Sequence, residues 1–160
     1  MPEPLPALCL IAVPGRRRRT IELAQETERR GFAGIYTPSP FGNMIPTCIS
    51  DDVEAAKAVN RRTLSNYAFL PNYRNYWKEA GYVEEMDAIE TAVAEGRRDD
   101  VAKYLSDKWL ADNTLFGPPA KVREGVAAWR AAGVHTPILV PSSAAGNQLT
   151  AVEEIFAAFA

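Results

Sequence analysis

The chain has 160 residues, of which 47% are hydrophobic and 24% are charged. This is the composition of an ordinary globular domain, and it excludes a disordered chain. With 18 Lys and Arg residues against 20 Asp and Glu residues, the net charge of −2 argues against broad binding to nucleic acid or anionic lipid, so we expect no nucleic-acid partner and no membrane partner.

The N-terminal segment and the two cysteines indicate where the protein works. Residues 1–8 contain three prolines and no basic stretch, unlike a secretory signal, and the apolar run over residues 8–13 is too short to cross a membrane. Cys9 and Cys48 each lie in an apolar segment, as buried thiols do in a reducing compartment. We therefore expect a soluble, cytoplasmic protein.

The first elements of the chain predict a strand–helix–strand unit. Residues 7–13 (ALCLIAV) are apolar on both faces, as in a buried strand, and Pro14-Gly15 ends them. We expect Thr20 to cap a helix over residues 21–30 and Gly31 to end it. Residues 33–37 (AGIYT) predict a second buried strand. A strand, a helix and a strand within about 30 residues form a parallel βαβ unit.

A third strand, over residues 45–49, precedes a long helical block. Apolar residues at steps of three and four, together with Pro and Gly at the expected ends, predict helices throughout this block. They run from a cap at Ser50 or Asp51 to about Phe69, from Pro71 to Gly81, and over residues 83–94, 99–105 and 108–112. Residues 50–112 contain no convincing strand, so we expect a helical subdomain within a single domain spanning residues 1–160.

The last part of the chain predicts a helix, a strand and a closing helix. Gly117-Pro118-Pro119 interrupts the chain, and a helix over residues 119–132 follows. Residues 136–140 (TPILV) predict a buried strand, and a Ser/Gly loop over residues 142–148 leads to a helix over residues 149–159. Four apolar strands, each followed by a helix directly or after a loop, favour a parallel sheet covered by helices.

Several stretches resemble the luciferase-like monooxygenase family of flavin and deazaflavin enzymes. The turn GFAGIY into the second strand is typical of that family, as is FGPP followed by a helix and AGV before the last strand. The resembling stretches are LCLIAVPGRRRRTIELAQETERRGFAGIYTPSP, CISDDVEAAKAV, LPNYRNYWKEAGY and TLFGPPAKVREGVAAWRAAGVHTPILVPSS. Together they cover most of the chain.

The chain is shorter than the complete barrel that this resemblance implies. Members of the family are eight-stranded (β/α) barrels, which take roughly 200 to 400 residues. The strand at residues 45–49 resembles the seventh strand, so strands three to six are missing and strands seven, eight, one and two remain as neighbours. The expected fold is therefore α/β: a partial TIM-barrel-like half-barrel of about four strands with a helical insertion, completed by dimerisation or strand exchange.

The connection between the second and third strands leaves three alternatives open. Residues 39–44 are fewer than the dozen or so that normally join neighbouring parallel strands. Either the third strand runs antiparallel to the second, or it is exchanged with a partner chain, or a middle segment is missing from the sequence. A half-barrel also has free edges and an exposed apolar inner face, so we expect a homodimer or a higher homo-oligomer.

Candidate cofactor-binding residues lie in the loops that follow the strands, the working face of a barrel. Guanidinium groups in the run of arginines at residues 16–19 suit a phosphate, although a solvated charge run is the alternative. The Ser/Gly loop before the last helix also suits an anion, although an ordinary capped loop has the same composition. The residues selected on these grounds are Arg16, Arg17, Thr37, Ser39, Ser142, Ser143 and Gly146.

Other candidates have a structural explanation. His135 stands just before the last strand, at the structural end of a barrel, and Asp51 and Asp52 are explained as helix caps. No spacing of His, Cys and Asp predicts a metal site. A group of aromatic residues lines either a substrate pocket or the core or partner interface of the helical subdomain, and we favour the second. The group is Tyr67, Phe69, Tyr73, Tyr76, Trp77 and Tyr82.

The resemblance implies an oxidoreductase or monooxygenase that moves a hydride between FMN or the deazaflavin coenzyme F-420 and a small organic substrate. It leaves the catalytic residues unassigned. In the family, the missing strands carry much of the cofactor pocket, so the alternative is a catalytically silent remnant that persists as an oligomeric or flavin-binding module. DNA binding through residues 16–19 is a third hypothesis, which the net charge opposes.

Overall fold

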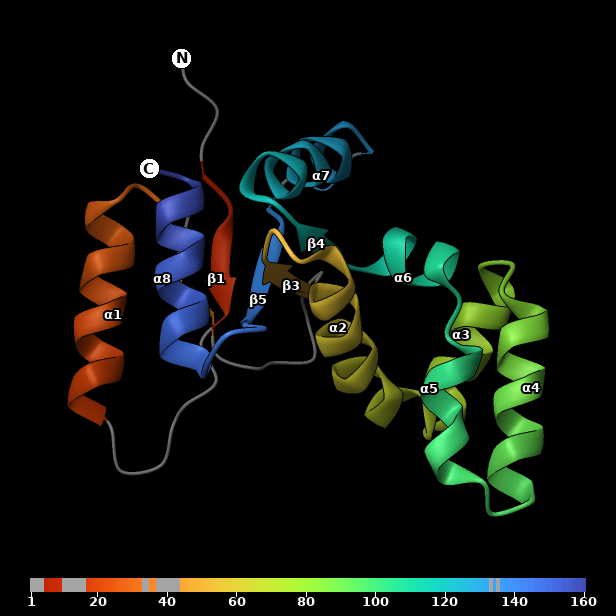
Figure 1. Cartoon of the computed structure of the whole chain (residues 1–160). Helices are drawn as coiled ribbons and strands as arrows, with labels where there is room; N and C mark the ends of the chain where they lie inside the picture. Colours follow the sequence, from red (N-terminus) through yellow and green to blue (C-terminus); the bar gives the residue numbers. More distant parts are fainter. Residues whose placement is uncertain (1–4, 10–16, 33–34, 37–43, 133, 135) are drawn as a thin grey trace.

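Parallel strands form one open sheet in the computed structural model of the chain (Figure 1). The structure describes residues 5–9, 17–32, 35–36, 44–132, 134 and 136–160. Within them the sheet has five strands in the order β2-β1-β5-β3-β4, and every neighbouring pair is parallel. The strands are β1 (Ala7–Cys9), β2 (Ile35–Tyr36), β3 (Met44–Ile49), β4 (Leu115–Gly117) and β5 (Ile138–Ser142).

The strand order confirms the partial barrel. Strands β3, β5, β1 and β2 are consecutive neighbours, as expected for the seventh, eighth, first and second strands of a barrel. Strand β4 was not predicted. It has three residues, too few for a sequence pattern, and it is defined by its pairing with β3, in which Leu115 lies opposite Thr47. Within the described residues β2 and β4 are the two ends of the sheet, which therefore does not close into a ring.

The antiparallel alternative for the third strand is wrong. Strand β3 pairs with β5 in parallel from Met44 opposite Ile138 to Cys48 opposite Ser142. Because β5 is parallel to β1 and β1 to β2, strand β3 also runs parallel to β2. The length rule for crossovers concerns neighbouring strands, whereas β1 and β5 separate β2 from β3. The residues that connect β2 to β3 lie outside the described ranges.

Three helices cover one face of the sheet: α1 (Arg17–Arg29), α7 (Pro119–Ala131) and α8 (Gln148–Ala158). Figure 1 shows α1 and α8 side by side, with α7 above the strands. The buried residues between these helices and the sheet are almost all aliphatic and include Leu8, Ile45 and Leu139 from three neighbouring strands. This cluster is the sheet core.

A helical block extends from the other side of β3 and β4 (Figure 1). It contains α2 (Val53–Ala68), α3 (Pro71–Glu79), α4 (Val83–Ala94), the 3-10 helix η1 (Arg98–Asp100), α5 (Val101–Tyr104) and α6 (Asp107–Asn113). Its own buried cluster, the block core, includes Trp77, Trp109, Cys48 and Phe116. Since successive residues of a strand point to opposite faces, β3 and β4 contribute Cys48 and Phe116 to the block core and Ile49 and Leu115 to the sheet core.

Two helix starts differ from the sequence prediction. Helix α1 begins at Arg17, so Thr20 lies inside the first turn and is not the cap; arginine favours helix, and the helix extends to include these residues. Helix α2 is capped by Asp52, whose carboxylate accepts the N–H of Ala55 at 3.0 Å. The hydroxyl of Ser50 instead accepts the N–H of Asp52, which makes a turn before the helix. Gly31 ends α1 as predicted, with a φ of 78°.

The expectation of an exposed apolar inner face is not met in the described part of the sheet. On the face opposite the sheet core, Ala7 and Ile138 are 0% and 5% exposed, and Met44 and Val140 are half-buried. The exposed large apolar side chains lie on the helical block instead. Among the described helices, none has the length and the apolar character needed to cross a bilayer.

Candidate functional site

The carboxyl ends of the strands meet at one edge of the sheet, because all the strands are parallel. Strand β5 leads there into the loop before α8, β3 leads to the cap of α2, and β4 leads to α7. Ser142, Ser143 and Gly146 lie on this edge. Arg17 is the first residue of α1, and its side chain lies outside the described part of the structure, as do the residues Arg16, Thr37, Ser39 and His135.

Ser143 is engaged on both sides of its hydroxyl group. Its Oγ donates a hydrogen bond to Oε1 of Glu154 on α8 at 2.8 Å and accepts the N–H of Ala145 at 3.1 Å. The preceding residue, Ser142, is half-buried and lies opposite Cys48 in the β3–β5 ladder. The loop after β5, helix α8 and strand β3 therefore bring the hydroxyl of Ser143, the carboxyl of Glu154 and the thiol of Cys48 to the same edge.

The carboxyl group of Glu154 has one oxygen that makes no hydrogen bond. Burial raises the pKa of Glu154 above its usual value, although the hydrogen bond from Ser143 acts in the opposite direction. Its Oε2 atom is buried and has no hydrogen-bond partner. A buried acceptor without a partner costs about 1–3 kcal/mol. Protonation, or an N–H or O–H group of a ligand, would remove that cost, so this carboxyl suits a role in binding or in holding a proton.

Cys48 forms the apolar wall of the cluster. The thiol is 0% exposed, and burial raises its pKa to about 11. The charge of Glu154 raises this pKa further, while the N–H of Ala144 opposes the shift. The thiol therefore stays protonated near neutral pH and is a poor nucleophile. We refer to Ser143, Glu154 and Cys48 as the edge cluster.

The loop that opens α8 is packed closely on its own helix. A side chain on Gly146 would place its Cβ 2.6 Å from Oγ1 of Thr150, so the loop has no room there for any other residue unless Thr150 moves. Asn147 caps α8, with its side chain accepting the N–H of Leu149 at 2.8 Å. Part of the anion-binding capacity of this helix start is thus used by the protein itself.

A cation lies at the same edge, at the end of β4. The side chain of Lys121, in the first turns of α7, runs beside Gly117, and its Nζ lies 4.6 Å from the centre of the Phe116 ring. Lys121 is exposed and has no ion pair with any described residue. Lys57, by contrast, pairs with both Glu54 and Asp107.

These groups fit a phosphate-bearing flavin in part. The ends of β4 and β5 are separated only by β3, a distance of about 10 Å at normal strand spacing. A ligand spanning that distance would meet the ammonium group of Lys121 at one end and the hydrogen-bonded pair of Ser143 and Glu154 at the other. Ser143 itself is occupied by Glu154, so it suits the polar rim of a ring better than a phosphate.

Three of these residues were missed by the sequence prediction: Glu154, Cys48 and Lys121. The sequence does hold one signal for Glu154. Helix α8 buries Ala151, Val152, Ile155 and Phe156, and Glu154 is an acidic residue within that apolar stretch. For Cys48 and Lys121 the signal is weaker, because their role depends on which strands become neighbours.

The predicted aromatic group divides into core and surface. Trp77 is 5% exposed and packs edge-on against the buried Trp109 at 4.8 Å between ring centres. Tyr67, Tyr73 and Tyr76 are exposed. Tyr82 is half-buried and donates a hydrogen bond from its hydroxyl to Asp112 at 2.5 Å. The aromatic group is therefore split: Trp77 belongs to the block core, and Tyr67, Tyr73 and Tyr76 lie on the surface of the helical block.

Comparisons with known proteins agree on one family. The model of the luciferase-like monooxygenase family matches residues 39–136, from before β3 to after α7. A relative from Mycobacterium tuberculosis, whose name assigns it as a coenzyme F-420-dependent oxidoreductase, is 29% identical over 102 residues, which are 60% of this chain. The chain spans 29% of that relative's length. No solved structure matches the chain.

Proposed function

Since the chain belongs to the luciferase-like monooxygenase family, we propose that it is an oxidoreductase of the flavin or deazaflavin class that acts on a small organic substrate. The observation that carries this proposal is the family match, which covers more than half of the chain. The name of the relative favours the deazaflavin F-420 over FMN. In such enzymes the cofactor supplies the hydride chemistry, while the protein binds and orients the reacting groups.

We place the cofactor at the carboxyl edge of the sheet. Of the residues selected from the sequence, Ser142 ends β5, Ser143 and Gly146 lie in the loop after it, and Arg17 is the first residue of α1. Arg16, Thr37 and Ser39 lie outside the described residues, and we assign them to the same site from their positions in the sequence, after the first and second predicted strands. Parallel strands bring these loops to one edge, and open α/β sheets bind ligands there. Lys121 adds a positive charge on the β4 side, which suits the phosphate of either cofactor.

The edge cluster would orient the polar rim of the ring. Oε2 of Glu154 is the buried acceptor that lacks a partner, and an N–H of the ring would supply one. Ser143 holds the other carboxyl oxygen in place at 2.8 Å. Burial also raises the pKa of Glu154, so this carboxyl takes up a proton more readily than an exposed glutamate does, which suits a residue that exchanges a proton with a bound ligand.

An anaerobic titration with FMN and with F-420, followed by cofactor fluorescence, tests the proposal. We expect quenching at micromolar concentrations of one of the two cofactors. Removing the Ser143 donor (Ser143→Ala) or the Glu154 acceptor (Glu154→Gln) should weaken binding about three- to tenfold, because one hydrogen bond contributes about 0.5–1.5 kcal/mol. Glu153→Gln makes the same charge change one position along α8 and serves as the control. No binding of either cofactor at millimolar concentration would refute the proposal.

The competing proposal is a catalytically silent remnant that binds a flavin or serves as an oligomeric module. It is favoured by the sheet of the described residues, whose five strands do not close into a ring. The two proposals differ in turnover. Oxidation of the bound reduced cofactor by aldehydes, ketones or enones in a substrate panel supports the enzyme, whereas tight binding without oxidation by any of them supports the remnant.

A further inference from the structure

The exposed large apolar side chains of the described residues come from one short stretch of the chain. They lie at the end of α2, at the turn into α3, on α3 and at the start of α4. These residues, which we call the tyrosine face, are Tyr67 (42% exposed), Leu70 (46%), Tyr73 (37%), Tyr76 (65%) and Val83 (47%). The rings of Tyr67 and Tyr73 are in contact, and Leu70 lies in the turn between their helices. Exposed apolar side chains that adjoin one another mark an interaction site more often than scattered ones do.

Helix α3 is held to the block by its other side, so the fold does not require these tyrosines. Trp77 is buried against Trp109, and Arg74 is 7% exposed. The guanidinium of Arg74 donates to the carbonyl of Ala68 at 2.8 Å and to Glu90 at 3.3 Å. Tyr76, between these two anchors in sequence, points away from the block core and is the most exposed residue of the tyrosine face.

The rings of the tyrosine face are already ordered against one another. Tyr67 and Tyr73 meet edge-on with ring centres 5.1 Å apart, and Tyr73 lies 5.7 Å from the anchored Trp77. Rigid aromatic side chains lose little conformational entropy on binding and are enriched at the centre of protein interfaces. The face is therefore prepared for a partner.

We propose that this partner is a second copy of the chain, docked through α3 about a two-fold axis. Helix α3 carries the same dipeptide twice, Asn72-Tyr73 and Asn75-Tyr76, three residues apart. If two copies of α3 pack antiparallel, each Asn-Tyr pair of one copy faces the other pair of the second copy. Amide and phenol groups both donate and accept hydrogen bonds, so such a surface complements itself, as a two-fold interface requires.

The charges at the ends of α3 fit the same arrangement. Glu79 is exposed at the carboxyl end of the helix, and the amino end, at Leu70 and Pro71, has no acidic residue in its first turn. In an antiparallel pair, the carboxylate of Glu79 approaches the amino end of the second copy's α3. A helix start favours a negative charge, so each end of the contact is electrostatically matched.

The exposed tyrosines supply part of the area that a stable dimer buries. With about 200 Å² for each aromatic side chain, the three tyrosines expose roughly 300 Å² together. A stable interface buries about 800 Å² per partner, so the tyrosine face supplies its apolar centre and the asparagines supply part of the rim. The edge of the sheet at β4 is a poorer candidate, because this strand has only three residues.

Sedimentation velocity of the full chain between about 1 and 200 μM tests the proposal, which does not depend on cofactor binding. We expect a concentration-dependent dimer of the 17.6 kDa chain. Tyr76→Asp should weaken association at least tenfold, because the two-fold axis would bring the buried carboxylate of one copy close to the same carboxylate of the second copy, and the two negative charges repel each other. Ala127→Asp places the same charge on an exposed position of α7 and should leave the dimer unchanged. Circular dichroism checks that both variants are folded.

A monomer throughout this range would overturn the proposal, and so would a folded Tyr76→Asp variant that dimerises as well as the unaltered chain. The first result would leave the tyrosine face to a different protein, and the second would place the contact elsewhere. Oxidative cross-linking gives a second measurement. Asn75→Cys should form a disulfide-linked dimer, whereas Glu28→Cys on α1, far from α3, should not (Figure 1). Cross-linking at Glu28 but not at Asn75 would also overturn it.

Discussion

Strands β3 and β4 separate two cores that differ in the kinds of side chain they contain. The sheet core is an aliphatic cluster covered by α1, α7 and α8, and parallel backbone pairing joins its strands. The block core holds two tryptophans, and ion pairs tie its helices together at the surface: Lys78 with Asp87 and Glu90, and Arg61 and Lys57 with Asp107. The two regions therefore also differ in the surface features they support. The sheet positions the edge cluster, and the block carries the tyrosine face.

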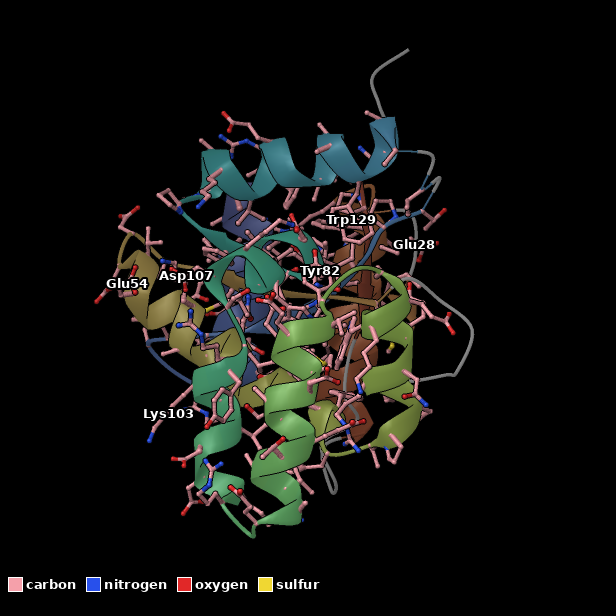
Figure 2. All side chains as sticks on the ribbon, turned by 90° about the vertical axis from the view of Figure 1, so that its right-hand side faces the viewer. Glu28, Glu54, Tyr82, Lys103, Asp107 and Trp129 are labelled. Atoms are coloured by element: carbon pink, nitrogen blue, oxygen red, sulfur yellow. The ribbon has the colours of Figure 1, made fainter. Side chains whose placement is uncertain are left out.

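The largest expected effect is on the block core. Trp109 is 0% exposed and touches Trp77, so Trp109→Ala leaves a large cavity and should lower the free energy of unfolding by about 3–5 kcal/mol. Trp129 on α7 is only partly buried against the sheet core (Figure 2), and Trp129→Ala should cost less. Urea denaturation followed by circular dichroism measures both. Equal losses would mean that the two cores do not differ in packing as described.

A smaller effect should follow from removing the polar anchor of α3. Arg74→Ala deprives the carbonyl of Ala68 of its partner and should lower the free energy of unfolding by about 1–3 kcal/mol. Arg62 is exposed on α2, and Arg62→Ala should change stability by less than about 0.5 kcal/mol. Thermal melts of the two variants give the comparison. If they were alike, the burial of Arg74 would not contribute to the attachment of α3.

The smallest effect is a difference in pH dependence between the two regions. Burial raises the pKa of Glu154 beside the sheet, so the folded protein holds this proton more tightly, and stability falls as pH rises above the usual value of 4.5. In the block, hydrogen bonds from Lys108 and Tyr82 lower the pKa of Asp112 below 3.8. Asp112 therefore stabilises the fold above 3.8, and this contribution is lost as pH falls through its lowered pKa.

Two matched variants separate these opposite trends. Relative to the unaltered chain, Glu154→Gln should gain stability as the pH rises from 4 to 7, as measured by urea denaturation at each pH. Asp112→Asn should instead lose stability relative to the unaltered chain as the pH rises from 2.5 to 5. Both effects should stay near or below about 1 kcal/mol, since neither carboxyl is fully buried. Trends of the same sign in the two variants would contradict the assignment.

The sequence predicted best where a local signal agrees with the tertiary structure. The helix over residues 83–94 has the bounds that its apolar steps of three and four indicate, and β3 extends the predicted strand by one residue. Gly31 and Gly81 adopt positive φ angles after α1 and α3, as helix ends require. The resemblance to the family supplied the strand order, which local patterns cannot provide.

The remaining features depend on contacts between distant residues. Strand β4 is defined by its pairing with β3, and three residues are too few to show the alternation of apolar and polar side chains that predicts a strand. The hydrogen bond between Ser143 and Glu154 requires that α8 fold back over the end of β5, which no spacing in the sequence indicates. The choice between Ser50, Asp51 and Asp52 as the cap of α2 was decided by one hydrogen bond, to Ala55.

The place of β5 in the sheet constrains how the molecule is made. It lies between β1 and β3 and pairs with both, yet it follows the other four described strands in the sequence and is synthesised after them. Until β5 has been synthesised, β1 and β3 each lack one of their two neighbours in the sheet. The pair β1 and β2 and the pair β3 and β4 are then not joined to each other. Unpaired strand edges promote aggregation, and the pairings of β5 with β1 and β3 join residues far apart in the sequence. We therefore expect the sheet to form late and slowly during folding.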